Sequence, residues 1–251
     1  MTSTGQTSVR SNPILRDSQG ASVMSHSAIQ PHSLDWMIRS IGQRYSYGFS
    51  WLGRPIIQYP QDIMALQEII WRVKPRLIVE TGIAHGGSLI FHASMLELLG
   101  GDGLVVGIDI DIRAHNRIEI ERHPMFKRAR MIEGSSIDPA IVEEVHRMAD
   151  DRGPVLVALD SNHTHDHVLQ ELQAYAPLVT AGSYLVVFDT VVEDMPPGSF
   201  PDRPWDKGNN PKTAVHEFLL TNDRFEIDRE IEAQLQITAA PDGYLRCVRD
   251  A

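Results

Sequence analysis

Apolar and amphipathic segments alternate along the chain from residue 60 to residue 220. Five short segments are mostly apolar: 77–79, 104–108, 129–132, 155–159 and 184–188. Five amphipathic segments have helical spacing, with Asp62 as the expected cap of the first: 62–73, 88–99, 139–149, 165–176 and 212–220. Apolar strands that alternate with amphipathic helices predict an α/β fold, in which a parallel sheet is covered on both faces.

The last part of the chain breaks this alternation. Apolar segments at 225–227, 234–237 and 244–247 follow one another with no helical pattern between them. We therefore expect terminal strands that close the sheet, at least one of them antiparallel.

The N-terminal part divides into two stretches of different character. Residues 1–30 are polar and lack periodicity, which predicts a flexible arm. Residues 31–75 contain a cluster of aromatic residues, and two interpretations stay open: a helix and loop packed on the core, or a lid or oligomer contact. Residues 76–251 form the expected main domain. Its long loop at 192–211 contains Phe200 and Trp205, which favour an ordered segment that faces a ligand.

Composition and charge argue against several classes of protein, namely nucleic-acid-binding, membrane-spanning and secreted proteins. The net charge is -10 without a basic block, which argues against nucleic acid as a partner. The single cysteine, Cys247, fits a reducing compartment. Apolar stretches are too short to cross a bilayer, and the first thirty residues lack the apolar core of a signal peptide. We expect a cytoplasmic protein.

A glycine-rich turn follows the first predicted strand and reads Glu80-Thr-Gly-Ile-Ala-His-Gly-Gly-Ser88. Gly82 and Gly86 would let the backbone approach a ligand and start the next helix. Position 84 holds alanine where a pyrophosphate-binding turn has its central glycine. The acid Glu80 followed by Thr81 suits instead a cationic cofactor without phosphate, such as S-adenosylmethionine (SAM). A purely structural turn is the alternative.

Two further strand ends carry polar residues that suit a nucleoside. Asp109 follows the second predicted strand, where its carboxylate would accept both ribose hydroxyls or, alternatively, cap a helix. After the third strand, Ser136 or Asp138 would supply hydrogen bonds to an adenine ring. However, Asp138 precedes a proline, which is equally typical of a helix cap.

A histidine-rich segment, Asp160-Ser-Asn-His-Thr-His-Asp-His167, follows the fourth predicted strand. It is one residue short of the His-x-His-x-Asp-His motif of binuclear zinc hydrolases. Asp160 as an oxygen ligand of a hard cation and His163 as a base fit the segment better. Asp189 follows the next strand, so it and Asp160 would lie on adjacent strand ends and share one divalent ion. His165 and His167 are equally typical of supporting or capping residues, and a structural role for His163 stays open.

The run from about Tyr45 to Val248 resembles the cephalosporin hydroxylase-like and rhamnosyl O-methyltransferase family. The matching stretches are 78–88, 106–109, 159–168, 177–187 and 243–246. The resemblance implies a Rossmann-like class I SAM methyltransferase fold, with a mostly parallel seven-stranded sheet and an antiparallel terminal strand. It also implies SAM-dependent and Mg²⁺-dependent methylation of a sugar hydroxyl, and a homo-oligomer.

The resemblance also assigns roles to residues. In similar enzymes the aspartate that ends the fourth strand binds magnesium and the residue three further on is the base, here Asp160 and His163. The next strand supplies two ligands, but Phe188 cannot ligate a metal. The metal site is thus expected to hold Asp160 and Asp189, with Thr190, Glu193 or water as the third ligand. The residues expected around SAM are Glu80, Thr81, Gly82, Gly86, Ser88, Asp109, Ser136, Asp138 and Asp160.

Two other functions compete with this interpretation. A zinc hydrolase would bind zinc through His163, His165 and His167 and would ignore SAM. A catalytically inactive partner protein with a methyltransferase fold is favoured only by the ligand missing at Phe188.

Overall fold

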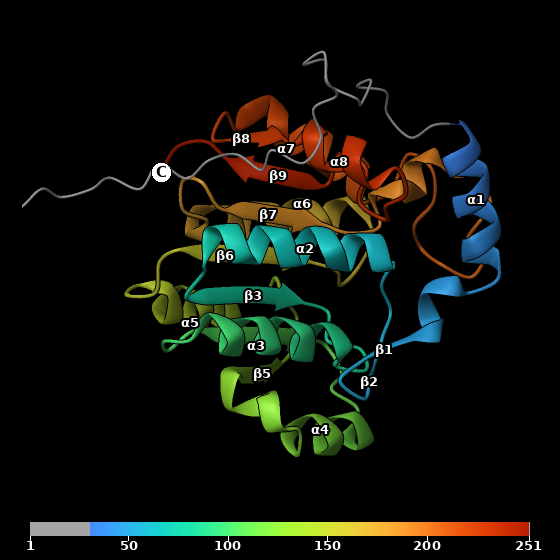
Figure 1. The fold of residues 1–251 in the computed structure, drawn as a ribbon. Helices are drawn as coiled ribbons and strands as arrows, with labels where there is room; N and C mark the ends of the chain where they lie inside the picture. The colour runs from blue at the N-terminus through green and yellow to red at the C-terminus, as the bar shows by residue number, and fades with distance from the viewer. Residues whose placement is uncertain (1–30, 251) are drawn as a thin grey trace, which may run out of the picture.

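A seven-stranded sheet runs through the molecule in the order β5-β4-β3-β6-β7-β9-β8 (Figure 1). The computed structural model describes residues 31–250, so the arm predicted for residues 1–30 lies outside the described residues. The strands are β3 (Leu77–Thr81), β4 (Leu104–Asp109), β5 (Ala129–Glu133), β6 (Val155–Leu159), β7 (Tyr184–Val187), β8 (Phe225–Ile227) and β9 (Tyr244–Cys247). The first five are parallel, and β9 runs antiparallel to both β7 and β8. The fold class expected from the sequence is confirmed.

Helices form a layer on each face of the sheet because successive side chains of a strand point to opposite faces. Ile78 belongs to the apolar cluster that contains α2 (Pro60–Val73) and α3 (Gly87–Leu99). Its neighbour Val79 belongs to a second cluster on the other face. That cluster contains α5 (Pro139–Ala149), α6 (His165–Tyr175) and α7 (Pro211–Thr221). Both layers are visible in Figure 1, with α2 and α3 in front of the sheet.

The chain reverses its winding at the centre of the sheet. From β3 it proceeds outward to β4 and β5, and it then returns to β6 on the other side of β3. As a result α3 leaves β3 toward one face, while α6 leaves β6 toward the other. Such a switch point opens a crevice at the carboxyl ends of the two central strands, where ligands bind in open α/β sheets.

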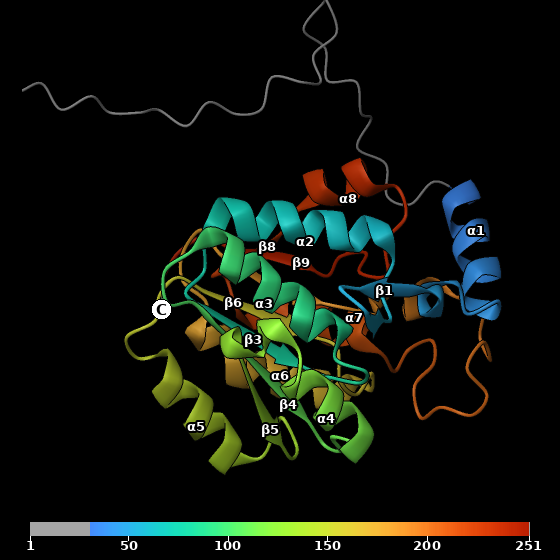
Figure 2. The ribbon, with the colours of Figure 1, turned by 60° about the horizontal axis from the view of Figure 1, so that its bottom comes forward.

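The N-terminal segment packs beside this crevice. It comprises α1 (Pro31–Gly42), a 3₁₀ turn η1 (Tyr45–Gly48) and a hairpin of β1 (Phe49–Trp51) and β2 (Arg54–Ile56). Met37, Ile56 and Tyr59 are buried in the same apolar cluster as α2 and α3. The segment therefore forms a helix and loop packed on the core. In Figure 2, α1 lies to one side of the sheet beside the orange loop that follows β7.

The expected strand at 234–237 is wrong. Those residues lie at the end of α8 (Arg229–Leu235) and in the loop after it. The Asp228 side chain starts this helix by accepting hydrogen bonds from the N–H groups of Glu230 and Ile231. A further helix, α4 (Ala114–Glu121), was also not anticipated. In both places a short helix replaces what the apolar pattern showed as strand or loop.

Asp62 is not the cap of α2. The helix begins at Pro60, and the Asp62 carboxylate is buried against the chain before β9. It accepts hydrogen bonds from the Thr238 hydroxyl, the Ala239 N–H at 2.9 Å and the Tyr244 hydroxyl at 2.7 Å. Burial without a cationic partner raises its pKa to about 6, although these three bonds oppose the shift.

This buried carboxyl makes stability depend on pH. The unfolded chain releases the Asp62 proton near pH 4, whereas the folded protein retains it to about pH 6. Stability from this group is therefore present below pH 4 and lost as the pH rises to 6, by about 3 kcal/mol at most. We expect the stability difference between wild type and Asp62→Asn to shrink over this range. Urea unfolding at pH 4.5 to 7.5 measures it, with Asp35→Asn, at an exposed position of α1, as the matched control. Parallel pH profiles for wild type and Asp62→Asn would contradict the assignment.

Candidate active site at the carboxyl ends of the strands

A cavity of about 1380 Å³ opens at the switch point. Single small-molecule pockets usually measure about 300–1,000 Å³, so this one has room for a cofactor and an acceptor together. The strand-end segments that line it are the glycine turn after β3, Asp109 and Ile110, 134–136, 160–163 and the loop after β7. Residues from the N-terminal segment complete the wall.

The glycine turn lies directly against the loop after β6. Gly82 has φ +89°, and a Cβ placed there would lie 2.0 Å from the carbonyl oxygen of Asp160. Only glycine allows this approach. The carboxylate of Asp109 accepts the N–H groups of Ile83 at 2.8 Å and Ala84 at 3.0 Å, which fixes the turn. Asp109 also lines the cavity, and it is not a helix cap, because α4 is preceded by Arg113.

Three residues expected to contact SAM lie behind the turn and do not line the cavity. Glu80 is buried and accepts hydrogen bonds from the Ser88 hydroxyl and, at 3.1 Å, the His92 ring. Thr81 is fully buried, and its carbonyl accepts the Asp160 N–H at 2.9 Å. Gly86 faces α4, where an added Cβ would meet a side-chain carbon at 2.4 Å. These residues support the turn, whereas Gly82 and Ser88 line the cavity as expected.

The two residues after β5 that were expected to contact adenine, Ser136 and Asp138, differ in their placement. Ser136 lines the cavity, and its hydroxyl donates to the buried Glu171 carboxylate at 2.6 Å. Asp138 does not line the cavity. Its carboxylate caps α5 by accepting the Ala140 N–H at 2.8 Å, so the structure supports the capping alternative for this residue.

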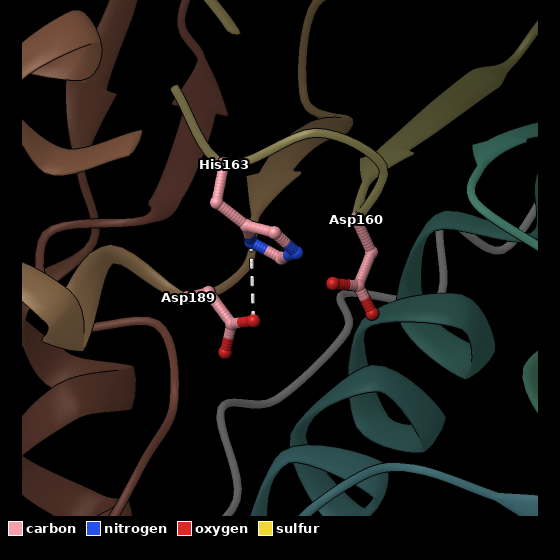
Figure 3. A group of neighbouring side chains, drawn as sticks. All are labelled: Asp160, His163 and Asp189. Atoms are coloured by element: carbon pink, nitrogen blue, oxygen red, sulfur yellow. Dashed lines mark ion pairs between the residues drawn. The ribbon is translucent and has the colours of Figure 1, made fainter. Parts of the chain in front are cut away.

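Asp160, His163 and Asp189 form one group in which ligand atoms lie within 4.8 Å of one another (Figure 3). The two aspartates converge because β6 and β7 are adjacent and parallel, with Leu159 opposite Val187. The Nδ1 atom of His163 lies 3.1 Å from Oδ2 of Asp189. The expectation that the carboxylates at 160 and 189 meet beside an imidazole is confirmed.

The electrostatics of the group favour a cation. Burial raises the pKa of Asp160 well above its usual range, and the nearby carboxylates of Asp189 and Glu80 raise it further. Among the described residues, no lysine or arginine forms an ion pair with Asp160 or Asp189. Gln58 donates from Nε2 to Oδ2 of Asp160 at 2.8 Å, which leaves Oδ1 for another partner. Two carboxylates in such a place suit Mg²⁺, which prefers oxygen ligands.

The other two expected metal ligands point elsewhere. Thr190 is buried, and its hydroxyl donates to the carbonyl oxygen of Pro241 at 2.6 Å. The Glu193 carboxylate accepts from the Gly208 N–H at 2.7 Å and the Asn210 side chain at 2.6 Å. Thr190 thus joins the start of the loop after β7 to the segment before β9, and Glu193 holds the loop itself, so the structure does not bring them to the metal group.

The remaining histidines of the segment do not join His163. His165 contacts the Thr213 hydroxyl at 2.8 Å and Glu217 at 3.1 Å. His167 lies near Ser136 and Glu171. A zinc site of three histidines is therefore not present in the described part of the chain. Although Phe188 supplies no ligand, Asp160 and Asp189 still provide two carboxylates to the group, with His163 beside them.

The loop after β7 brings two aromatic residues to the cavity, one of them next to His163. The Trp205 ring lies 4.6 Å from the His163 ring between centroids, and Trp205 and Phe200 line the cavity. The expectation that they face a ligand is supported. Sequence reasoning did not identify Gln58, because no motif marks an isolated amide that contacts the site from a distant segment.

Comparison with solved structures identifies the class of fold. The fold is that of class I SAM methyltransferases. A CmcI structure described with Mg and SAM covers 80% of this chain and 77% of its own, at 20% identity and a TM-score of 0.57. An O-methyltransferase from Bacillus cereus in complex with SAH covers 78% of this chain and 82% of its own, at 16% identity and a TM-score of 0.52.

Sequence comparison then gives the family. The family described as rhamnosyl O-methyltransferase/CmcI matches residues 43–248, and this chain belongs to it. A rhamnosyl O-methyltransferase of Mycobacterium tuberculosis is 33% identical over 188 residues, which is 73% of this chain and 72% of that protein. One from Mycobacterium leprae is 32% identical over 148 residues, 59% of this chain and 62% of that protein.

Proposed function

We propose that this protein transfers the methyl group of SAM to a sugar hydroxyl, with a divalent cation, Mg²⁺, held by Asp160 and Asp189. The observation that carries the proposal is the convergence of these carboxylates with His163 beside the glycine turn. The family and its curated relatives, which are named rhamnosyl O-methyltransferases, support the same chemistry.

The cavity residues have separate tasks in this reaction. The bound cation supplies positive charge that lowers the pKa of an acceptor hydroxyl, and SAM supplies the methyl group. Asp109 and Ser88, with the backbone of the glycine turn, would bind the nucleoside and methionine parts of SAM. Ser136 would lie beside the adenine. Holding both reactants in one cavity supplies much of the remaining rate enhancement.

His163 would remove the hydroxyl proton. Its Nδ1 atom faces Asp189, so an Nδ1–H that donates to this carboxylate leaves Nε2 as the proton acceptor. Packing on Trp205 holds the imidazole plane. A sugar hydroxyl ionises poorly at neutral pH, which is why both a cation and a base are required.

The acceptor is a deoxysugar in this proposal, carried by a glycolipid, a polysaccharide, a nucleotide or a natural product. Tyr47, Phe200 and Trp205 line the cavity, and we assign them to the acceptor because aromatic faces suit the C–H faces of a sugar ring. The N-terminal segment that contains Tyr47 would thereby act as a lid.

The proposal is tested by titration and by product mass. SAM binding is measured calorimetrically with Mg²⁺ and with EDTA, and glycosides are then screened for a gain of about 14 Da, the mass of one CH₂ group. We expect SAM to bind and the mass gain to require a divalent cation. Methylation that is unaffected by EDTA would remove the metal from the mechanism, and absence of SAM binding would refute the function.

Assembly and location are further parts of the proposal. None of the helices in residues 31–250 has the length and apolar character that a membrane span needs. Met64 and Trp71 are exposed one above the other on α2, at 56% and 54%, which supports association of copies through this helix. We propose a cytoplasmic homo-oligomer, and light scattering measures its mass.

A further inference from the structure

The hairpin strand β2 contacts the glycine turn from outside the cavity. The guanidinium of Arg54 donates to the carbonyl oxygen of His85 from Nε at 3.1 Å and from Nη2 at 2.6 Å. Nη2 also donates to Oδ1 of Asn116 at 3.1 Å. Arg54 and Asn116 do not line the cavity, whereas His85 does. Neither side chain is therefore placed to contact a ligand there.

Asn116 continues the same arrangement on α4. Its side chain is buried, and its Nδ2 donates to the carbonyl oxygen of Ala84 at 3.0 Å. Two consecutive carbonyl groups of the turn are thus held by two side chains that also bond to each other. A network of connected hydrogen bonds, such as this one between a guanidinium group, an amide and two carbonyl groups, restricts motion more than separate hydrogen bonds do.

The turn needs such restraint. Ala84 has φ +46°, a left-handed conformation that is unfavourable for a residue with a Cβ. Asp109 holds the N–H groups of Ile83 and Ala84 on the opposite side of the same peptide segment. Asp109 at the end of β4 therefore holds the N–H groups of residues 83 and 84. Asn116 and Arg54 hold the carbonyl groups of residues 84 and 85.

Close packing reinforces this contact. A Cβ on Gly87 would lie 2.3 Å from the carbonyl oxygen of Pro55, the residue that follows Arg54. The first residue of α3 and strand β2 thus approach each other backbone to backbone, which fixes the distance over which the Arg54 side chain reaches His85.

We propose that Arg54 and Asn116 are positioning residues that preorganise the glycine turn for SAM without contacting it. The inference rests on the proposed function, since it assigns these residues to the cofactor half of that site. A preformed turn avoids the entropic cost of ordering residues 83–85 on binding, so its loss weakens SAM affinity. The metal group lies at the ends of β6 and β7, and among the described residues it shares no hydrogen bond with Arg54 or Asn116.

The test uses the full-length protein and two titrations, SAM and Mg²⁺ alone, by calorimetry. We expect Arg54→Ala and Asn116→Ala each to weaken SAM binding about tenfold, the loss typical of a hydrogen bond to a charged group. Arg54→Lys retains the charge but not the forked donor geometry, so it should recover part of the loss. The Kd of Mg²⁺ should stay within about twofold in all variants, and KM for SAM should rise more than kcat falls.

Two further variants make the result decisive. The double variant Arg54→Ala with Asn116→Ala should lose less than the product of the single effects, because the two side chains bond to each other. Arg39→Ala, at an exposed position of α1, is the matched control and should bind SAM like wild type.

Several outcomes would overturn the inference. Wild-type SAM affinity in Arg54→Ala or, if that variant does not fold, in Arg54→Lys would dismiss the positioning role alone. A parallel loss of SAM and Mg²⁺ affinity would show a merely structural role. Wild-type protein that does not bind SAM would refute the proposed function and this inference with it.

Discussion

Asp160→Asn is expected to abolish methyl transfer and to raise the melting temperature of the metal-free protein. The carboxyl is half-buried, and desolvation together with Asp189, Glu80 and other acids raises its pKa, so removing the charge relieves repulsion. Asparagine keeps the shape and an oxygen that accepts from Gln58. Loss of the metal ligand should lower kcat/KM by about 10³-fold or more, because a polarising cation is worth several kcal/mol.

Three measurements check this result. Thermal unfolding without metal should show a gain of a few degrees, about 2–4 °C for each kcal/mol. SAM titration should be nearly unchanged, and Mg²⁺ titration should show no binding. In wild type, Mg²⁺ must displace the Asp160 proton, so its affinity should rise with pH. Turnover that persists in Asp160→Asn or Asp160→Ala would refute the metal site.

His163→Ala is expected to lower kcat by about 10²–10⁴-fold, the usual contribution of a well-placed base. Mg²⁺ affinity should change little, since the two carboxylates supply the oxygen ligands that Mg²⁺ prefers. Added imidazole should restore part of the rate by occupying the space beside Trp205. Steady-state kinetics with and without imidazole, together with Mg²⁺ titration, measure these effects.

The matched control for this variant is His165→Ala. His165 comes from the same segment but bonds to Thr213 and does not line the cavity. It should retain turnover within about threefold, as for a substitution outside the reacting groups. If His163→Ala instead loses Mg²⁺ affinity in proportion to its rate, the imidazole is a metal ligand and not the base.

The sheet and the convergence of Asp160 with Asp189 could be predicted because both follow from strong, local constraints. A strand such as Val155–Leu159 is apolar throughout, so it fits only between two covered faces. Once β6 and β7 are parallel neighbours, the residues after them must share one edge of the sheet. The turn at Gly82 could be predicted for the same reason, because the positive φ of this residue is a local property of the turn.

Side-chain direction and distant partners could not be predicted. Glu80 is the next-to-last residue of β3, close to the expected strand end. Its side chain points toward His92 on α3, and nothing in the spacing distinguishes that direction from one toward the cavity. Asp62 resembles a helix cap, yet its partner Thr238 lies 176 residues away. The alternation around Leu235 imitates a strand, although the Asp228 cap in fact starts a helix there.

The two outermost strands of the sheet determine how copies of this protein can associate. Strand β8 is three residues long and bears Glu226, which pairs with Arg246. Strand β5 bears Arg130, which pairs with Glu144 at 2.5 Å. Edge strands that are short or that carry charged side chains oppose hydrogen bonding to a strand of a neighbouring chain. Assembly should therefore bring helical surfaces together instead of extending the sheet, and the protein should resist fibrillar aggregation.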